Sequence, residues 1–107
     1  FEGYGHLVPD VAYWGPDKPQ GDERRSLPPT LAVEVRSPDQ SMDELRAKCR
    51  LMRTHGVDAC WLIDPYGKAA EVFEGARDGE PVAAGGALES SFLPGFRLDL
   101  DDLFAEV

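Results

Sequence analysis

The chain has 107 residues, 42% of them apolar, and a formal net charge of −9. This composition is ordinary for one small folded domain or part of a larger one, and it argues against a disordered chain. No run of about 18 apolar residues is present, so no membrane-spanning helix is predicted. The acidic balance argues against a protein that coats nucleic acid without specificity.

Two strands are predicted in the first third of the chain. Residues 8–14, VPDVAYW, and residues 31–36, LAVEVR, have the β-branched and aromatic residues typical of strands. The segment 15–29 between them is rich in proline, glycine and charge, which predicts an exposed connection. Alternation along the second strand places Glu34 and Arg36 on one face, and on the other face it places Leu31, Val33 and Val35.

A helix is predicted next, from a serine cap to about His55. Both SPDQ at 37–40 and SMDE at 41–44 match the capping-box pattern, in which a serine and the residue three positions later exchange hydrogen bonds with the backbone. Gly56 is suited to ending the helix. Lys48 flanks the apolar stripe of this helix. The stripe recurs at spacings of three and four residues and consists of Met42, Leu45, Cys49 and Met52.

The rest of the chain predicts a returning sheet. Residues 59–63 are nearly all apolar, as in a central strand, and DPYGK at 64–68 is a turn that leads to a hairpin partner at 69–73. The last expected elements are a turn at 74–81, a short strand near Val82, a strand at Phe96–Leu98 and a short helix with Leu100, Leu103 and Phe104. This order indicates a single α/β domain over residues 1–107, with a mixed β-sheet and a crossover helix.

Charge is uneven along the chain. Residues 24–53 hold seven Arg or Lys residues against four acidic residues, a local balance of +3. Such a basic strip is able to face a phosphate backbone. It is equally compatible with a solvated helix face, which is the commoner case.

The two cysteines, Cys49 and Cys60, are too few for a disulfide framework or a cysteine metal cluster. One lies on the predicted helix and the other in a predicted strand. We therefore expect two small buried side chains in a reducing, cytoplasmic environment.

Three residues are best suited to chemistry, namely Asp10, Glu34 and Lys48, with Arg36 as a second cation. Asp10 and Glu34 lie on two predicted strands, and neighbouring strands would let both carboxylates converge on one divalent cation. Mg²⁺ (or Mn²⁺) takes oxygen ligands and keeps several waters, so two protein carboxylates are sufficient. A nearby ammonium would then orient a water or stabilise charge on a phosphate.

Each of these residues also has a purely structural interpretation. Glu34 and Arg36 can form an exposed ion pair worth about 0–1 kcal/mol. Asp10 follows a proline and suits the start of a strand, and Lys48 can pair with Glu44 one helical turn earlier. Spacing alone leaves both interpretations open.

Several motifs together resemble one protein family. They are VPDVAYW at 8–14, the segment from LAVEVRSPDQ to EVFEG at 31–75, and LPGFRLDLDDLF at 93–104. A Pro-Asp strand, a strand with glutamate followed by Ser-Pro, a helix with lysine and a tryptophan strand ending in Asp-Pro resemble the Uma2 family of restriction-endonuclease-like proteins. This family is part of the PD-(D/E)xK nuclease superfamily.

The resemblance implies a restriction-endonuclease-like core that hydrolyses the DNA backbone, with Asp10 and Glu34 as the metal-binding acids. The usual lysine two residues after the second acid is Arg36 here, and Lys48 matches the helix position to which the family moves it. The resemblance also implies that an N-terminal part is missing and that this chain is the C-terminal portion of a longer domain. An open sheet edge would follow, which a homodimer would cover. The alternative is a catalytically inactive nuclease-like domain that acts in binding or assembly.

Overall fold

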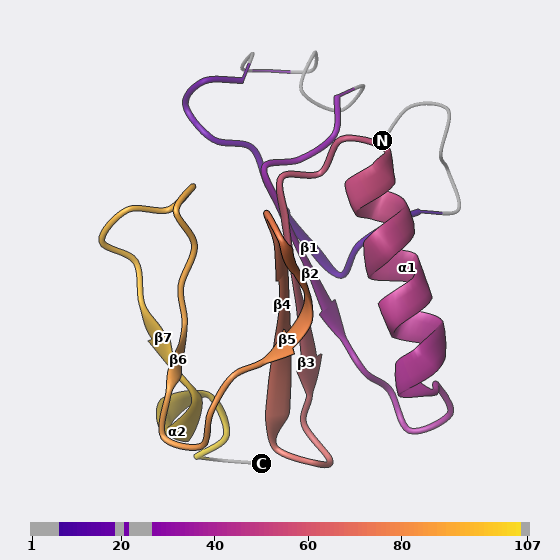
Figure 1. Ribbon diagram of the computed structural model, residues 1–107, viewed down its shortest axis with the longest axis vertical. Coiled ribbons are helices and arrows are strands. Elements are labelled where there is room, and N and C mark those ends of the chain that lie inside the picture. Colours follow the sequence, from indigo (N-terminus) through magenta and orange to yellow (C-terminus); the bar gives the residue numbers. More distant parts are fainter. Residues whose placement is uncertain (1–6, 19–20, 22–26, 106–107) are drawn as a thin grey trace.

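The computed structural model describes residues 7–18, 21 and 27–105 (Figure 1). Part of the predicted connection between the first two strands, residues 19–20 and 22–26, lies outside the described residues. The elements of the described part are β1 (Val11–Tyr13), β2 (Leu31–Val35), α1 (Met42–Thr54), β3 (Ala59–Asp64), β4 (Ala69–Glu74), β5 (Arg77–Pro81), β6 (Ala87–Leu88), β7 (Leu98–Asp99) and α2 (Leu100–Leu103).

The main sheet has five strands in the order β1-β2-β3-β4-β5. β2 and β3 are parallel, and α1 makes the crossover between them, whereas the other neighbouring pairs are antiparallel. The mixed α/β sheet predicted from the sequence is therefore confirmed. None of the described helices has the length and apolar content that crossing a membrane requires.

The sheet separates two apolar cores, because successive side chains of a strand point to opposite faces. On one face, Ala32, Cys60 and Leu62 pack with the buried stripe of α1. On the other face, Val33 and Trp61 pack with residues of β6 and α2. Figure 1 shows the same three layers, with α1 on one side of the sheet and β6, β7 and α2 on the other. Glu34 is the buried charged residue of β2 and lies on the α1 side.

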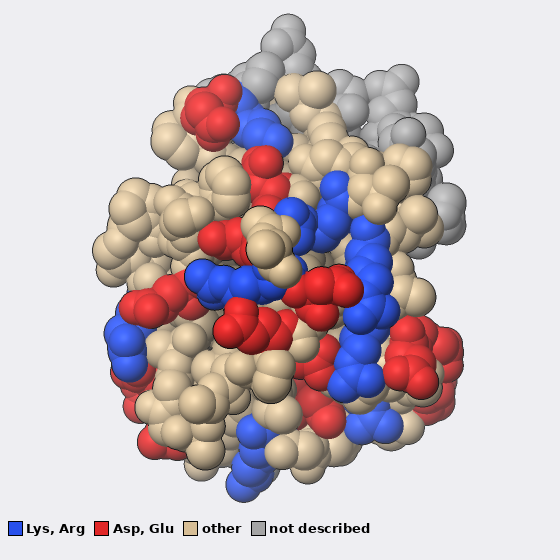
Figure 2. All heavy atoms as spheres, viewed as in Figure 1, with Lys and Arg blue, Asp and Glu red and all other residues tan. Residues whose placement is uncertain are grey.

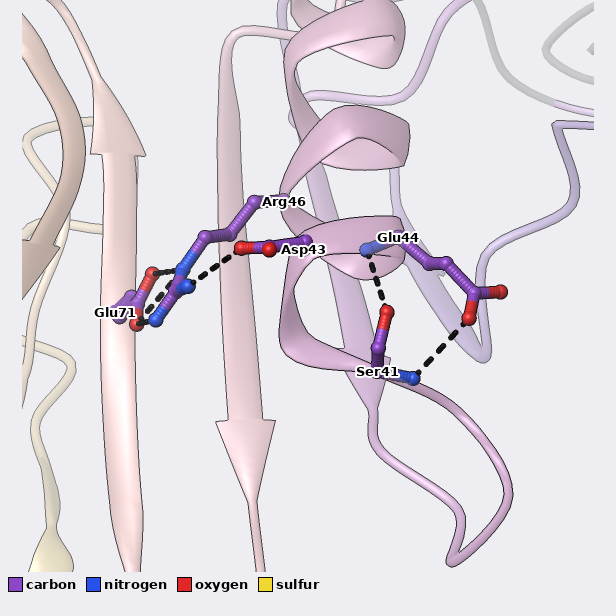
Figure 3. A network of polar contacts seen from close by, with 5 residues as sticks. All are labelled: Ser41, Asp43, Glu44, Arg46 and Glu71. Atoms are coloured by element: carbon purple, nitrogen blue, oxygen red, sulfur yellow. Dashed lines mark hydrogen bonds and ion pairs between the residues drawn. The ribbon is translucent and has the colours of Figure 1, made fainter.

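The first turn of α1 is set by a capping box at the second of the two predicted serines (Figure 3). The Ser41 side chain accepts a hydrogen bond from the Glu44 backbone N–H at 3.1 Å, and Glu44 accepts one from the Ser41 backbone N–H at 3.4 Å. Ser37 does not cap the helix. Its backbone N–H donates to the Gln40 side chain at 2.9 Å, which closes the loop before the helix. Gly56 follows the helix with φ of +106°, a conformation that glycine adopts without strain.

The second half of the chain differs from the prediction in three strands. Residues 77–81, expected to be a turn, form the edge strand β5, β6 was not predicted, and β7 begins two residues later than expected. β5 is mostly exposed and polar, so its sequence lacks the apolar alternation that indicates a strand. Backbone pairing with β4 forms this strand, with a register shift between Val72 and Phe73.

The loop after β6 is tied to β4 by a buried carboxylate, Glu74. Burial raises the pKa of Glu74, but hydrogen bonds donated by Ser90 and Ser91 outweigh it, so the pKa lies below its usual value. The ionised form is therefore the one that holds the two layers together.

Candidate active site

Two hydrogen bonds from backbone N–H groups hold Asp10 against Glu34 and Val35 at the end of β2. The Asp10 backbone N–H donates to Glu34 Oε2 at 3.0 Å, and the Val35 backbone N–H donates to Asp10 Oδ2 at 2.7 Å. The antiparallel register, with Val11 opposite Val33, sets Asp10 beside Glu34. Asp10 therefore lies directly before β1 and next to Glu34 of β2.

Lys48 reaches the same place from α1. Its ammonium forms an ion pair with Glu34 Oε1 and donates a hydrogen bond to the Val8 carbonyl at 2.9 Å. The Glu34 side chain is 2% exposed and the Lys48 side chain is 27% exposed. A carboxylate removed from water to this degree needs a charged partner. Lys48 supplies it from the edge of the apolar stripe of α1, where the helix faces β2.

Arg36 binds Gln40 and Asp64, and Glu34 binds Lys48. The Arg36 guanidinium donates from Nε to the Gln40 carbonyl at 2.8 Å and from Nη1 to Asp64 Oδ1 at 3.3 Å. The interpretation of Glu34 and Arg36 as an exposed ion pair is therefore wrong, because Glu34 is buried and paired with Lys48. The suggested pair of Lys48 with Glu44 is likewise replaced by the pair with Glu34.

The two carboxylates fit a hard divalent cation by their chemistry. Mg²⁺ prefers oxygen ligands and is usually held by one or two carboxylates with waters. An ionised carboxylate offers about four acceptor sites, and Glu34 uses one oxygen toward Lys48 and the other toward Asp10. A cation would therefore compete with Lys48 for Glu34. The part of the chain that the structure describes has no cluster of three or more His, Cys, Asp or Glu residues able to hold a metal ion.

The sequence model of a family named Uma2, described as "Putative restriction endonuclease", matches residues 1–101. The chain belongs to the Uma2 family. The same resemblance was expected from its strand and helix motifs, and it is confirmed.

A solved structure shares the fold of this Uma2 chain. It is described as a "putative nuclease belonging to DUF820" from Anabaena variabilis ATCC 29413 and has a TM-score of 0.66 with 27% sequence identity. The match covers 74% of this chain and 45% of that one, so the Uma2 chain spans less than half the length of this relative. A search of curated proteins found no match.

The basic strip of this Uma2 chain is matched by acidic side chains. Figure 2 shows basic side chains gathered along α1 with acidic ones beside them. Arg46 pairs with Glu71 of β4, and Arg50 pairs with Asp78 of β5. Arg46, Lys48 and Arg50 of the strip therefore form helix-to-sheet ion pairs. Arg24 and Arg25 lie outside the described residues.

The two cysteines are free and fully buried, as expected. The Cys60 thiol donates a hydrogen bond to Cys49 Sγ at 2.9 Å between β3 and α1. This hydrogen bond and the burial of both groups raise the pKa of Cys60 far above its ordinary value. Cys60 therefore stays a neutral thiol and has no nucleophilic character.

Sequence reasoning missed the partners of Arg36, which are Gln40, Asp64 and Tyr66. Asp64 ends β3 and starts the turn to β4, and the guanidinium of Arg36 lies 5.5 Å from the centroid of the Tyr66 ring. The predicted topology could have indicated that Arg36 and Asp64 lie close together. Arg36 and Asp64 both follow parallel neighbouring strands, whose carboxyl ends lie at the same edge of a sheet.

Proposed function

We propose that this Uma2 domain is a Mg²⁺- or Mn²⁺-dependent endonuclease that hydrolyses the DNA backbone. The family description and the description of the Anabaena variabilis structure support nuclease chemistry. The observation that carries the proposal is the pair of hydrogen bonds that sets Asp10 beside Glu34, with Lys48 bound to Glu34. In this proposal Asp10 and Glu34 are the metal ligands and Lys48 is the catalytic cation.

In this proposal, Asp10, Glu34 and Lys48 have separate roles. A divalent cation, when bound, supplies Lewis-acid activation of the phosphodiester and of the attacking water. Asp10 and Glu34 hold their carboxylates in fixed positions through backbone hydrogen bonds, so little reorganisation is needed. The Lys48 ammonium, once shared between Glu34 and the substrate, stabilises negative charge that develops on the phosphate.

Calorimetric titration with Mn²⁺ tests this proposal directly. Wild-type protein should show one site, and Asp10→Asn should lose it, because the variant keeps the shape of the side chain but removes its charge. Asp10 is exposed, so the substitution should leave the fold intact. Nicking of supercoiled plasmid in Mg²⁺ should be lost in the same variant.

Asp101→Asn is the matched control, because Asp101 is an exposed acid on α2, on the other side of the sheet from α1. It should bind Mn²⁺ and nick plasmid like the wild type. Equal Mn²⁺ binding by wild type and Asp10→Asn, or no binding by either, would rule out the metal assignment.

The second candidate function is assembly by a catalytically silent domain. An apolar groove of about 580 Å³ opens on the sheet face opposite α1, and none of its lining residues is charged. Val11 of the edge strand β1 is 55% exposed there, and Phe96 is 49% exposed. Two copies of a protein with a net charge of −9 repel each other, and this repulsion is weakest where they meet through uncharged surfaces. We therefore propose that a second copy of the chain covers this exposed apolar face.

Light scattering after size exclusion tests the second candidate. The wild type should run as a dimer and Phe96→Glu as a monomer, because the new carboxylate would be buried in the interface. Phe92→Glu is the control, since Phe92 is 42% exposed but lies outside the groove. A monomeric wild type would exclude this interface. A cytoplasmic location is part of both proposals and is supported by the two free thiols.

A further inference from the structure

A polar cluster lies at the carboxyl ends of the parallel strands β2 and β3, next to the candidate active site. It consists of Arg36, Asp64 and Tyr66. The Arg36 backbone N–H donates to the Ile63 carbonyl at 2.9 Å, so the residue continues the pairing of β2 with β3. Figure 1 shows the β2–α1 loop and the β3–β4 turn at the same end of the sheet. Glu34 and Arg36 are two strand residues apart, about 7 Å along the strand.

The Arg36 guanidinium is held in place but retains free donors. Two of its five N–H groups donate to the Gln40 carbonyl and to Asp64 Oδ1. The side chain is 25% exposed, so the group is open to a ligand. A planar guanidinium fixed in this way is suited to bind a phosphate through paired hydrogen bonds.

Asp64 holds the backbone of Tyr66 close to this guanidinium. The carboxylate oxygen that accepts from Arg36, Oδ1, also accepts from the Tyr66 backbone N–H at 3.1 Å. A Cβ at position 67 would lie 2.7 Å from Asp64 Oδ2, so Gly67 is needed for the carboxylate to keep this position. The Tyr66 side chain itself is 56% exposed. The ring therefore lies beside the guanidinium and is open to solvent.

Unpaired bases bind proteins by stacking on aromatic rings and on guanidinium planes. We propose that Arg36 and Tyr66 bind one unpaired nucleotide of a DNA strand, with Arg36 on a phosphate, Tyr66 stacked on the base and Asp64 as their positioning residue. The inference rests on the proposed nuclease function and names its substrate as a strand that is single-stranded at this point. Bases inside a duplex are stacked on each other and do not reach the ring.

Affinity should come from stacking more than from charge. Arg36 already shares its charge with Asp64, and the protein as a whole carries −9. A site of this kind neutralises few phosphates, so its affinity should depend only weakly on salt.

Fluorescence anisotropy with a labelled 12-nucleotide single-stranded DNA tests the site, in EDTA so that no metal takes part. Tyr66→Ala should weaken binding about tenfold, the effect of losing one stacked base. Tyr66→Phe keeps the ring and should bind like the wild type. Replacing the bases by abasic sites should weaken the wild type about tenfold and should leave Tyr66→Ala unaffected, because that variant has no ring to lose.

Three results would overturn the proposal: equal affinity of wild type and Tyr66→Ala, equal affinity of wild type for normal and abasic strands, or tighter binding of a duplex of the same length. The comparison of normal with abasic DNA uses wild-type protein, so it tests the proposal even if a variant folds poorly. Since every arm is free of metal, loss of this site and loss of the Mn²⁺ site at Asp10 are separate outcomes.

Discussion

Replacing Lys48 by methionine is expected to lower the free energy of unfolding by about 3–5 kcal/mol, as measured by urea denaturation. The substitution keeps the length of the side chain but leaves the carboxylate of Glu34, 2% exposed, without its counter-charge. The reverse change, Glu34→Gln, should cost less, because the Lys48 side chain is 27% exposed and can turn its ammonium toward water.

The double variant Glu34→Gln/Lys48→Met separates the ion pair from the packing around it. With both charges removed, the free energy of unfolding should return to within about 1.5 kcal/mol of the wild type, since neutral groups of similar volume replace a buried ion pair at little cost. A double variant as unstable as Lys48→Met would instead assign the loss to packing.

Mn²⁺ adds a second measurement on the same variants. If Glu34 is a metal ligand, a bound cation replaces the missing ammonium, so Mn²⁺ should raise the melting temperature of Lys48→Met more than that of the wild type. If Mn²⁺ raises both melting temperatures equally, Glu34 is not a metal ligand and serves only as the structural partner of Lys48. Loss of nicking in Lys48→Met therefore has to be interpreted together with the measured stability of that variant.

Replacing Arg46 by methionine is expected to cost about 3 kcal/mol in urea denaturation. Arg46 of α1 donates to both oxygens of Glu71 on β4, from Nε at 2.9 Å and from Nη2 at 2.6 Å (Figure 3). The Glu71 side chain is 11% exposed, so the variant leaves a buried charge unpaired. The hydrogen bonds to Glu71 and the charge of Glu71 also raise the pKa of Arg46 above its ordinary value, so the guanidinium stays charged.

Arg50→Met is the matched control, one helical turn further along α1. Arg50 pairs with Asp78, but these side chains are 50% and 65% exposed, and exposed pairs are worth about 0–1 kcal/mol. The contact of Arg50 with the Phe73 ring adds little at such an exposed site. If both variants lose the same free energy of unfolding, the burial of Glu71 does not explain the contribution of the Arg46 pair.

Much of the candidate site followed from local pattern. Strand alternation separated Glu34 from the apolar face of its strand, and helical spacing placed Lys48 at the edge of the apolar stripe. The structure then showed that α1 covers the face with Glu34. The β1–β2 register then set Asp10 beside Glu34. The expected strands and helix formed because each depends on side-chain direction within one element or on the pairing of strands with strong apolar patterns.

The sequence by itself determined the mixed sheet and the crossover helix, because the periods of strands and helices are local properties. Only the tertiary structure decided which charges meet. It paired Glu34 with Lys48, turned Arg36 toward Asp64 and Tyr66, and formed β5 from an exposed polar segment. Such pairings depend on the register of distant segments and on competition among several nearby charges, and neither is encoded in the spacing of one segment.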